Sequence, residues 1–174
     1  LTAIEKASAG QVVFAPTGLL NPGLQRLLDV RRVVGLRNPA HSLVKLMNPC
    51  AGKAFIVGSY THPEYASSMA ATWSLTGAHA MLLRGTEGEP VADARRTPRM
   101  EIFQNGERTE VQPQQDGPLA QLPSLPSVDA AHTAAYIRAV LDGSLPIPTP
   151  IALQVEHILR ALEHHDSPTH AHAL

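Results

Sequence analysis

The fold is decided by two apolar runs, Ala54-Phe55-Ile56-Val57-Gly58 and His79-Ala80-Met81-Leu82-Leu83, and by the segment between them. Neither run alternates apolar with polar residues, which is typical of strands buried on both faces. Between them, Thr61 can cap a helix that has Pro63 in its first turn and ends at Gly77. Strand, helix and strand in this order predict a right-handed crossover that joins two parallel strands.

A β-hairpin is predicted further along the chain. Residues 100–104 and 107–111 flank Asn105-Gly106, and this dipeptide supplies the two positive-φ residues of a type I′ turn. Ser127 at its start and Gly143 at its end predict a helix near residues 128–142, and an apolar stripe predicts another near residues 150–162. We therefore expect an α/β fold with a mostly parallel central sheet, flanked by helices and carrying this Asn-Gly β-hairpin.

The composition limits the possible functions. The chain has 174 residues, of which 44% are hydrophobic, enough for one domain with its own core. Its formal net charge is −1, so binding to nucleic acid would need a local basic patch. A single cysteine, Cys50, excludes an internal disulfide. Without a signal peptide or an apolar run of membrane length, we expect a cytoplasmic protein without membrane contact.

The segment Val30–Pro49 places cations beside apolar runs. If residues 23–34 form a helix, the helical period puts Arg31 on the apolar arc with Leu27 and Val34, and Arg32 on the polar side. An unpaired guanidinium in a core costs several kcal/mol. Arg31 is therefore either paired for structural reasons or holds a ligand.

The same segment resembles the anthranilate phosphoribosyltransferase family (glycosyltransferase family 3), in which it reads V-R-x-x-L-G-I-R-T-x-F-N-x-L-G-P-L-x-N-P. The matching positions are Val30, Arg31, Gly35, Arg37, Leu43, Leu46, Asn48 and Pro49. The family's G-P step is Val44-Lys45 here, and His41 replaces its asparagine. With these departures the chain resembles the sister group of YbiB-type DNA-binding proteins more than the tryptophan-pathway enzymes.

The resemblance covers roughly residues 10–162 and implies that the chain is a fragment of a larger protein. Residues 1–162 would be the C-terminal α/β domain, incomplete at its N-terminus, and residues 163–174 a flexible tail with several histidines. In the family, an N-terminal helical domain precedes this part and forms the homodimer. The family's phosphate-binding motifs, G-T-G-G-D and K-H-G-N, do not occur in these residues.

A loop after the second predicted strand, Arg84–Pro90, lies where open α/β sheets bind their ligands. In the resembling enzymes this loop carries an adjacent Asp-Glu pair that holds magnesium against the diphosphate. Glu87 and Glu89 stand near that place but are not adjacent. Mg²⁺ is therefore expected only if the chain is a transferase, and otherwise we expect no cofactor.

Two functions remain open. The first is a phosphoribosyltransferase, a pentosyltransferase that moves phosphoribose from phosphoribosyl diphosphate to anthranilate or a related aromatic acceptor. The resemblance would then give Arg31 the role of binding the acceptor's carboxylate. No catalytic residue is assigned. The altered loop and Lys45 in place of the family's proline argue against this function.

The second function is non-specific binding of DNA or RNA by a catalytically degenerate member of the group. Phosphate contacts need clustered cations and no particular base readout. The candidates, which could converge at one edge, are Arg32, Arg37, Lys45, Arg84, Arg95 and Arg96. Aromatic residues make up only 4% of the chain, so we expect contacts to the phosphate backbone to dominate over base stacking. We rank this function slightly above the transferase, and a folded part without activity of its own is the third possibility.

Overall fold

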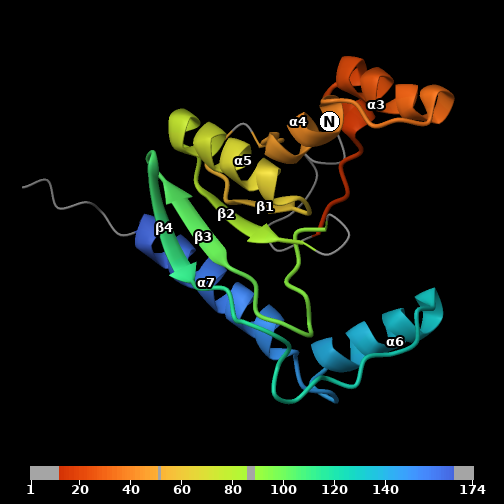
Figure 1. Cartoon of the computed structure of the whole chain (residues 1–174), viewed down its shortest axis with the longest axis vertical. Coiled ribbons are helices and arrows are strands. Elements are labelled where there is room, and N and C mark those ends of the chain that lie inside the picture. The colour runs from red at the N-terminus through yellow and green to blue at the C-terminus, as the bar shows by residue number, and fades with distance from the viewer. Residues whose placement is uncertain (1–11, 51, 86–88, 167–174) are drawn as a thin grey trace, which may run out of the picture. The chain divides into compact units, whose positions relative to one another are not determined.

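The computed structural model describes residues 12–50, 52–85 and 89–166, with side chains up to residue 163. The chain divides into two compact units, Leu1–Ala54 and Phe55–Leu174, and each is described here by itself. In Figure 1 the first unit is coloured red to orange, and the second runs from yellow to blue.

The first unit is helical where it is described. Its elements are α2 (Thr17–Leu20), α3 (Pro22–Val34), α4 (Ala40–Leu43) and the 3₁₀ helix η1 (Val44–Leu46). The side chain of Asn21 caps α3 by accepting a hydrogen bond of 2.9 Å from the backbone N–H of Leu24. Gly35 ends the helix in the left-handed region, with φ of 76°. The predicted helix is thus confirmed to within one residue at its start.

Asn38 holds the segment after α3 against that helix. Its Nδ2 donates a hydrogen bond to the carbonyl oxygen of Leu27 at 2.6 Å, and its Oδ1 accepts one from the N–H of Ala40 at 3.0 Å. One side chain therefore ties the middle of α3 to the start of α4.

The second unit contains a four-stranded sheet. Its strands are β1 (Ile56–Tyr60), β2 (Ala80–Arg84), β3 (Met100–Gln104) and β4 (Glu107–Gln112), in the spatial order β1-β2-β3-β4. The helix α5 (Pro63–Thr76) joins β1 to β2, which are parallel, so the predicted crossover connection is confirmed. The α/β class is confirmed as well. The other two strand pairs are antiparallel, so the described sheet is mixed where the sequence predicted a mostly parallel one.

The predicted hairpin is confirmed at its turn. Asn105 has φ of 52° and Gly106 has φ of 87°, so both central residues occupy the left-handed region that a type I′ turn requires. Asn105 is the one described non-glycine residue with positive φ. The start of α5 differs from the expectation, because its N-cap residue is His62 and not Thr61, and no side chain caps it.

Helices cover both faces of the sheet (Figure 1). On the α5 face, Trp73 is 1% exposed and packs edge-on against Phe103, with ring centroids 5.6 Å apart. On the other face, Met81, Leu83 and Met100 form a buried cluster that contacts Leu153 and Ile158 of α7 (Thr149–Asp166). The remaining helix, α6 (Ala130–Leu141), buries no residue fully.

The helix α7 is longer than the sequence predicted. It continues to Asp166, so the expected boundary between domain and tail at residue 162 falls inside a helix. Residues 167–174, with two of the tail's histidines, lie outside the described residues. Within the described ranges, no helix is both long enough and apolar enough to cross a membrane.

His157 on α7 is expected to make the stability of the second unit depend on pH. The ring is half-buried, and its Nε2 lies 3.5 Å from Oε1 of Gln112. Burial lowers the pKa of His157 below its ordinary value, while nearby Glu156 acts in the opposite direction. The folded protein therefore binds this proton less readily than the unfolded chain does. The stabilisation is present above the unfolded pKa of about 6.5 and is lost as the pH falls below it.

We expect His157→Gln to weaken this pH dependence. Thermal unfolding followed by circular dichroism between neutral and mildly acidic pH would measure it. The melting temperature of the unmodified protein should fall more than that of the variant as acid is added. His62→Gln is the control, because this histidine before α5 is exposed and makes no ion pair with any described residue. Equal slopes for the unmodified protein and the His157 variant would contradict the expectation.

Candidate functional site

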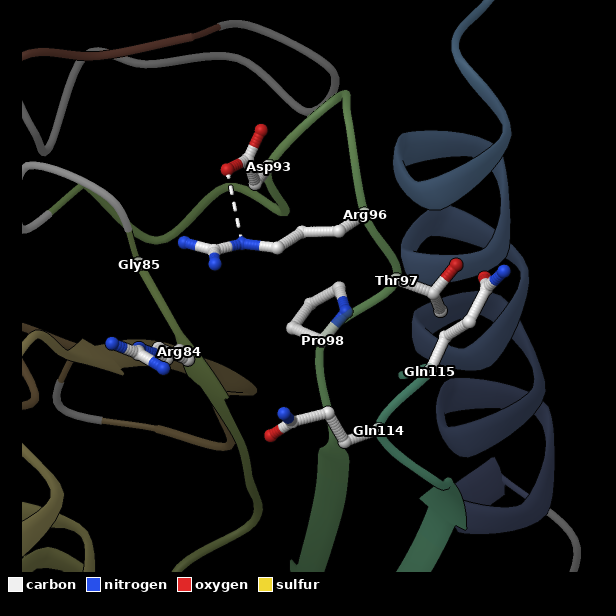
Figure 2. Close-up of a pocket in the computed structure, with 8 residues that line it drawn as sticks. All are labelled: Arg84, Gly85, Asp93, Arg96, Thr97, Pro98, Gln114 and Gln115. Carbon is white, nitrogen blue, oxygen red and sulfur yellow. Dashed lines mark ion pairs between the residues drawn. The ribbon is translucent and has the colours of Figure 1, made fainter. Parts of the chain in front are cut away.

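A small hollow lies at the carboxyl end of β2, where the sequence predicted a ligand loop. Figure 2 shows the side chains around it, which come from the end of β2, the segment before β3 and the segment after β4. The lining residues are Arg84, Gly85, Asp93, Arg96, Thr97, Pro98, Gln114 and Gln115. Two arginines and several neutral hydrogen-bonding groups thus surround one carboxylate, a lining suited to an anionic ligand.

Asp93 organises the arginines beside this hollow. Arg95 binds it in a bidentate manner, with Nε 2.9 Å from Oδ1 and Nη2 3.1 Å from Oδ2. The Nε of Arg96 lies 3.2 Å from Oδ2 of the same carboxylate. The hydrogen bonds from Arg95 are the largest cause that lowers the pKa of Asp93, and burial acts against them. Asp93 is therefore ionised at neutral pH and orients two guanidinium groups.

Gly85 leaves room for the close approach of three segments. A Cβ atom at this position would lie 2.6 Å from the carbonyl oxygen of Glu89 and 2.9 Å from Oγ of Ser59. The N–H of Gly85 donates a hydrogen bond of 3.0 Å to the carbonyl oxygen of Tyr60, which extends the pairing of β1 and β2 by one residue. A larger residue would push the loop away from the sheet.

Gln154 fixes the loop on its other side. This side chain of α7 is 5% exposed. Its Oε1 accepts a hydrogen bond of 2.8 Å from the N–H of Ala92, and its Nε2 donates one of 2.9 Å to the carbonyl oxygen of Pro90. Sequence reasoning missed this residue, because a glutamine in an amphipathic helix gives no sign that it binds backbone more than 60 residues away.

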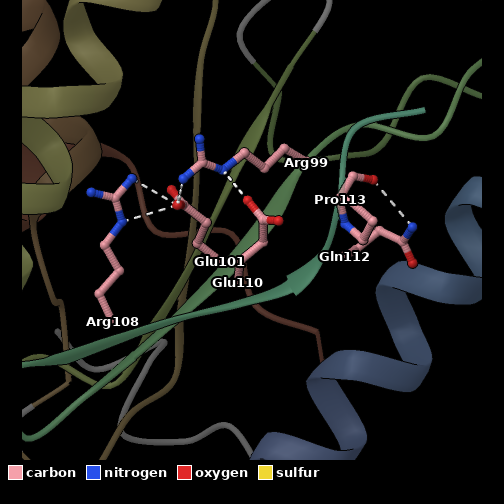
Figure 3. A network of polar contacts seen from close by, with 6 residues as sticks. All are labelled: Arg99, Glu101, Arg108, Glu110, Gln112 and Pro113. Atoms are coloured by element: carbon pink, nitrogen blue, oxygen red, sulfur yellow. Dashed lines mark hydrogen bonds and ion pairs between the residues drawn. The ribbon is translucent and has the colours of Figure 1, made fainter. Parts of the chain in front are cut away.

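A network of charged side chains crosses the hairpin on the α5 face of the sheet (Figure 3). Glu101 is 4% exposed, and its Oε1 accepts hydrogen bonds from Nε of Arg108 at 2.9 Å and from Nη2 of Arg108 at 2.7 Å. Arg99 binds the same carboxylate and also Glu110, with Nε 2.7 Å from Oε2. Arg99 and Arg108 are therefore both ion-paired with carboxylates of the hairpin.

This network also escaped the sequence analysis. The available signal was the period of two in the hairpin, which puts residue 99, just before β3, on the same face as residue 101, and residues 108 and 110 on one face of β4. Which of these side chains would meet depends on the pairing register between the strands.

In the first unit, Arg31 is not in the environment that its position on the apolar arc suggested. Its side chain is exposed and makes no ion pair with any described residue. No residue of α3 is fully buried, so the helix does not hold Arg31 in a core. Leu27, Val30 and Val34 on the same arc are 55%, 42% and 58% exposed. The alternative of a structurally paired Arg31 is therefore not seen, and the ligand alternative stays a prediction.

The other cations of the first unit differ in their surroundings. Arg37 is exposed and makes no ion pair within the described ranges. Arg32 makes a long contact of 3.5 Å with Asp29, and its side chain is 84% exposed. Lys45 on η1 is half-buried. That these cations share an edge with Arg84, Arg95 and Arg96 stays a prediction.

The expected metal ligands are only partly described. Glu87 lies outside the described residues, and Glu89 is exposed. Among the residues that the structure places, no group of three or more His, Cys, Asp or Glu side chains could hold a metal ion. The family's magnesium site therefore stays a prediction tied to the transferase function.

Comparisons with known proteins agree with the family that the sequence suggested. The chain is 37% identical over 152 residues to the uncharacterized protein YbiB of Escherichia coli. The matched residues cover 86% of this chain and 47% of YbiB. It is 30% identical over 142 residues to the anthranilate phosphoribosyltransferase of Leifsonia xyli, covering 80% of this chain and 40% of that enzyme.

The anthranilate phosphoribosyltransferase of Acidothermus cellulolyticus is likewise 30% identical over 154 residues, or 86% of this chain and 42% of the enzyme. No family model matches the chain. The chain spans less than half the length of these relatives.

Proposed function

We propose that this chain, an anthranilate phosphoribosyltransferase-like α/β domain similar to YbiB, binds nucleic acid without sequence preference through its arginines. In this proposal the domain has lost the transferase activity of its relatives. The replacement of the family's Gly-Pro step by Val44-Lys45 and the separation of the two loop carboxylates support that loss. Two hard oxygen ligands at one point are what fix a metal on a diphosphate.

The observation that carries the proposal is the availability of the guanidinium groups. Arg31, Arg37 and Arg84 are exposed and make no ion pair with any described residue. Because no carboxylate neutralises them in the described part of the chain, their charge is available to phosphate oxygens. Contacts of this kind release condensed counterions, which makes binding strong at low salt and independent of sequence.

Arg95 and Arg96 add to this set although both bind Asp93. Their side chains are 55% and 50% exposed, and they share a single carboxylate. A guanidinium has several N–H donors in a rigid plane, and Arg95 and Arg96 each use only some of these donors to bind Asp93. The remaining donors face solvent in a fixed orientation, which lowers the entropy lost when a phosphate binds.

A second candidate is an active phosphoribosyltransferase. The exposed Arg31 favours it, because an arginine without an ion pair to any described residue could bind the carboxylate of an aromatic acceptor. The hollow at the carboxyl end of β2 also lies where open α/β sheets bind substrates. Phosphoribosyl diphosphate, the acceptor and Mg²⁺ would then be the ligands.

Binding of the full-length protein to a random-sequence DNA duplex at a series of salt concentrations tests the proposal. We expect appreciable affinity at low salt that falls steeply as salt is added. The variants Arg37→Ala and Arg84→Ala should each weaken binding to all sequences alike and reduce the slope against log salt by about 1. Arg160→Ala is the matched control, because this exposed arginine is already paired with Glu156 on α7.

Absence of binding at the lowest salt concentration would refute the nucleic-acid function. The second candidate is then decided by turnover of phosphoribosyl diphosphate with anthranilate and magnesium. If the protein turns these substrates over, Arg31→Ala should raise KM for the acceptor more than it lowers kcat, because its proposed contact is to a part of the acceptor that does not react.

A further inference from the structure

Tyr60 and Arg84 lie side by side at the carboxyl end of the parallel strands. They are register partners in the pairing of β1 with β2, so their Cα atoms are separated by the ordinary strand spacing of about 4.8 Å. Both side chains lie on the α5 face of the sheet. Gly58, two residues before Tyr60, marks that face, because a Cβ atom there would lie 2.6 Å from the Trp73 ring.

The charged side chains near this pair already form ion pairs with one another. Arg99 and Arg108 bind Glu101, and Arg99 also binds Glu110. Arg84 makes no ion pair with any described residue, and it is exposed. The hydroxyl of Tyr60 likewise makes no hydrogen bond within the described part of the chain, and the residue is partly exposed. Within the described part of the chain, the guanidinium of Arg84 therefore has no carboxylate partner and the hydroxyl of Tyr60 has no hydrogen-bond partner.

The phenol of Tyr60 is neutral at physiological pH. Burial and the nearby carboxylate of Glu101 raise its pKa above the ordinary value, and the arginines around it act in the opposite direction. A neutral tyrosine offers an uncharged π-face and a hydroxyl that can donate a hydrogen bond. It does not repel an approaching phosphate, as a phenolate would.

We propose that Tyr60 and Arg84 form a subsite for one nucleotide of a single-stranded nucleic acid, in which the base stacks on the Tyr60 ring and a neighbouring phosphate binds Arg84. This inference rests on the proposed nucleic-acid function and adds a preference to it. In a duplex the faces of the bases are covered by their neighbours. Only a single strand can turn a base onto an aromatic side chain, and such stacking tolerates any sequence.

The subsite changes the expectation from composition. With 4% aromatic residues, the chain was expected to bind mainly through contacts to the phosphate backbone. One tyrosine beside one arginine that has no ion pair in the described part of the chain is sufficient for a single stacking contact, because the base and the phosphate of a nucleotide are then recognised at adjacent positions. The scarcity of aromatic residues limits the number of such contacts and does not exclude one.

Binding of the full-length protein to three probes of equal length tests the subsite. The probes are a mixed-sequence single strand, the same strand made abasic, and the duplex. We expect Tyr60→Leu to weaken binding to the single strand by about tenfold, within the range for the loss of one stacked base, and to leave the abasic strand and the duplex unchanged. Tyr60→Phe keeps the ring and should keep the affinity. Arg84→Ala should weaken binding to all three.

A second variant removes the dependence on how well Tyr60→Leu folds. In Tyr60→Trp a new indole stands at the proposed stacking position, while the native Trp73 is only 1% exposed and cannot stack on a ligand. The fluorescence of the new indole at position 60 should be quenched by the single strand and not by the abasic strand. Equal quenching by both strands, or equal weakening of both by Tyr60→Leu, would overturn the subsite. Failure of the unmodified protein to bind any probe would instead refute the proposed function.

Discussion

Replacement of Trp73 by alanine is expected to lower the free energy of unfolding of the second unit by about 3–5 kcal/mol, the range for large aromatic residues in a core. Trp73 is 1% exposed and fills the space between α5 and the sheet. Its ring lies against Phe103 of β3 and over Gly58 of β1, so it contacts both the parallel and the antiparallel parts of the sheet. A cavity at this point would remove contacts from each of them.

Urea unfolding followed by circular dichroism measures this effect without relying on the tryptophan's own fluorescence. Tyr65→Ala is the control, because Tyr65 stands two helical turns earlier on α5 and is 43% exposed. We expect the control to cost much less than Trp73→Ala. Similar losses for both variants would show that the α5 face does not form the core of this unit.

The space around Trp73 also explains the glycine opposite it. Gly58→Ala would bring a methyl group to 2.6 Å from Cη2 of the buried Trp73 ring. Overpacking of this kind typically costs about 1–3 kcal/mol. The two substitutions should not be additive, because the smaller residue at position 73 leaves space for the methyl group at position 58.

The second large effect is expected for Glu101→Ala. This carboxylate is buried and accepts hydrogen bonds from two arginines, which would lose their common partner. Removal of one side of a buried ion pair costs about 3–5 kcal/mol. The side chains of Arg99 and Arg108 are each 42% exposed and can turn toward water, so we expect a loss of about 3 kcal/mol, at the lower end of that range.

Glu110→Ala is the matched control for this network. Glu110 binds Arg99 from the neighbouring strand, but its side chain is 45% exposed. Exposed ion pairs contribute at most about 1 kcal/mol, because water and salt screen them. Chemical denaturation at neutral pH compares the two variants. A loss for Glu101→Ala no larger than for Glu110→Ala would contradict a structural role for the buried carboxylate.

The sequence by itself determined the local elements of the fold. The buried strands and the helix between them were readable from residues 54–83, and the hairpin turn from Asn105-Gly106. The helix expected over residues 23–34 was also readable, and Gly35 ends it with a left-handed backbone. These features depend on hydrophobic period and on allowed φ values, and both are properties of short stretches of chain. The resemblance to the transferase family was also present in one short segment.

The tertiary structure decided what these elements bring together. It set β3 antiparallel against β2 and thereby made the sheet mixed. It left Arg31 exposed where the helical period had placed it among apolar residues. It joined Gln154 to a loop more than 60 residues away, and it placed Tyr60 beside Arg84. Such contacts depend on strand register and on the packing of distant segments, which no local pattern of residues encodes.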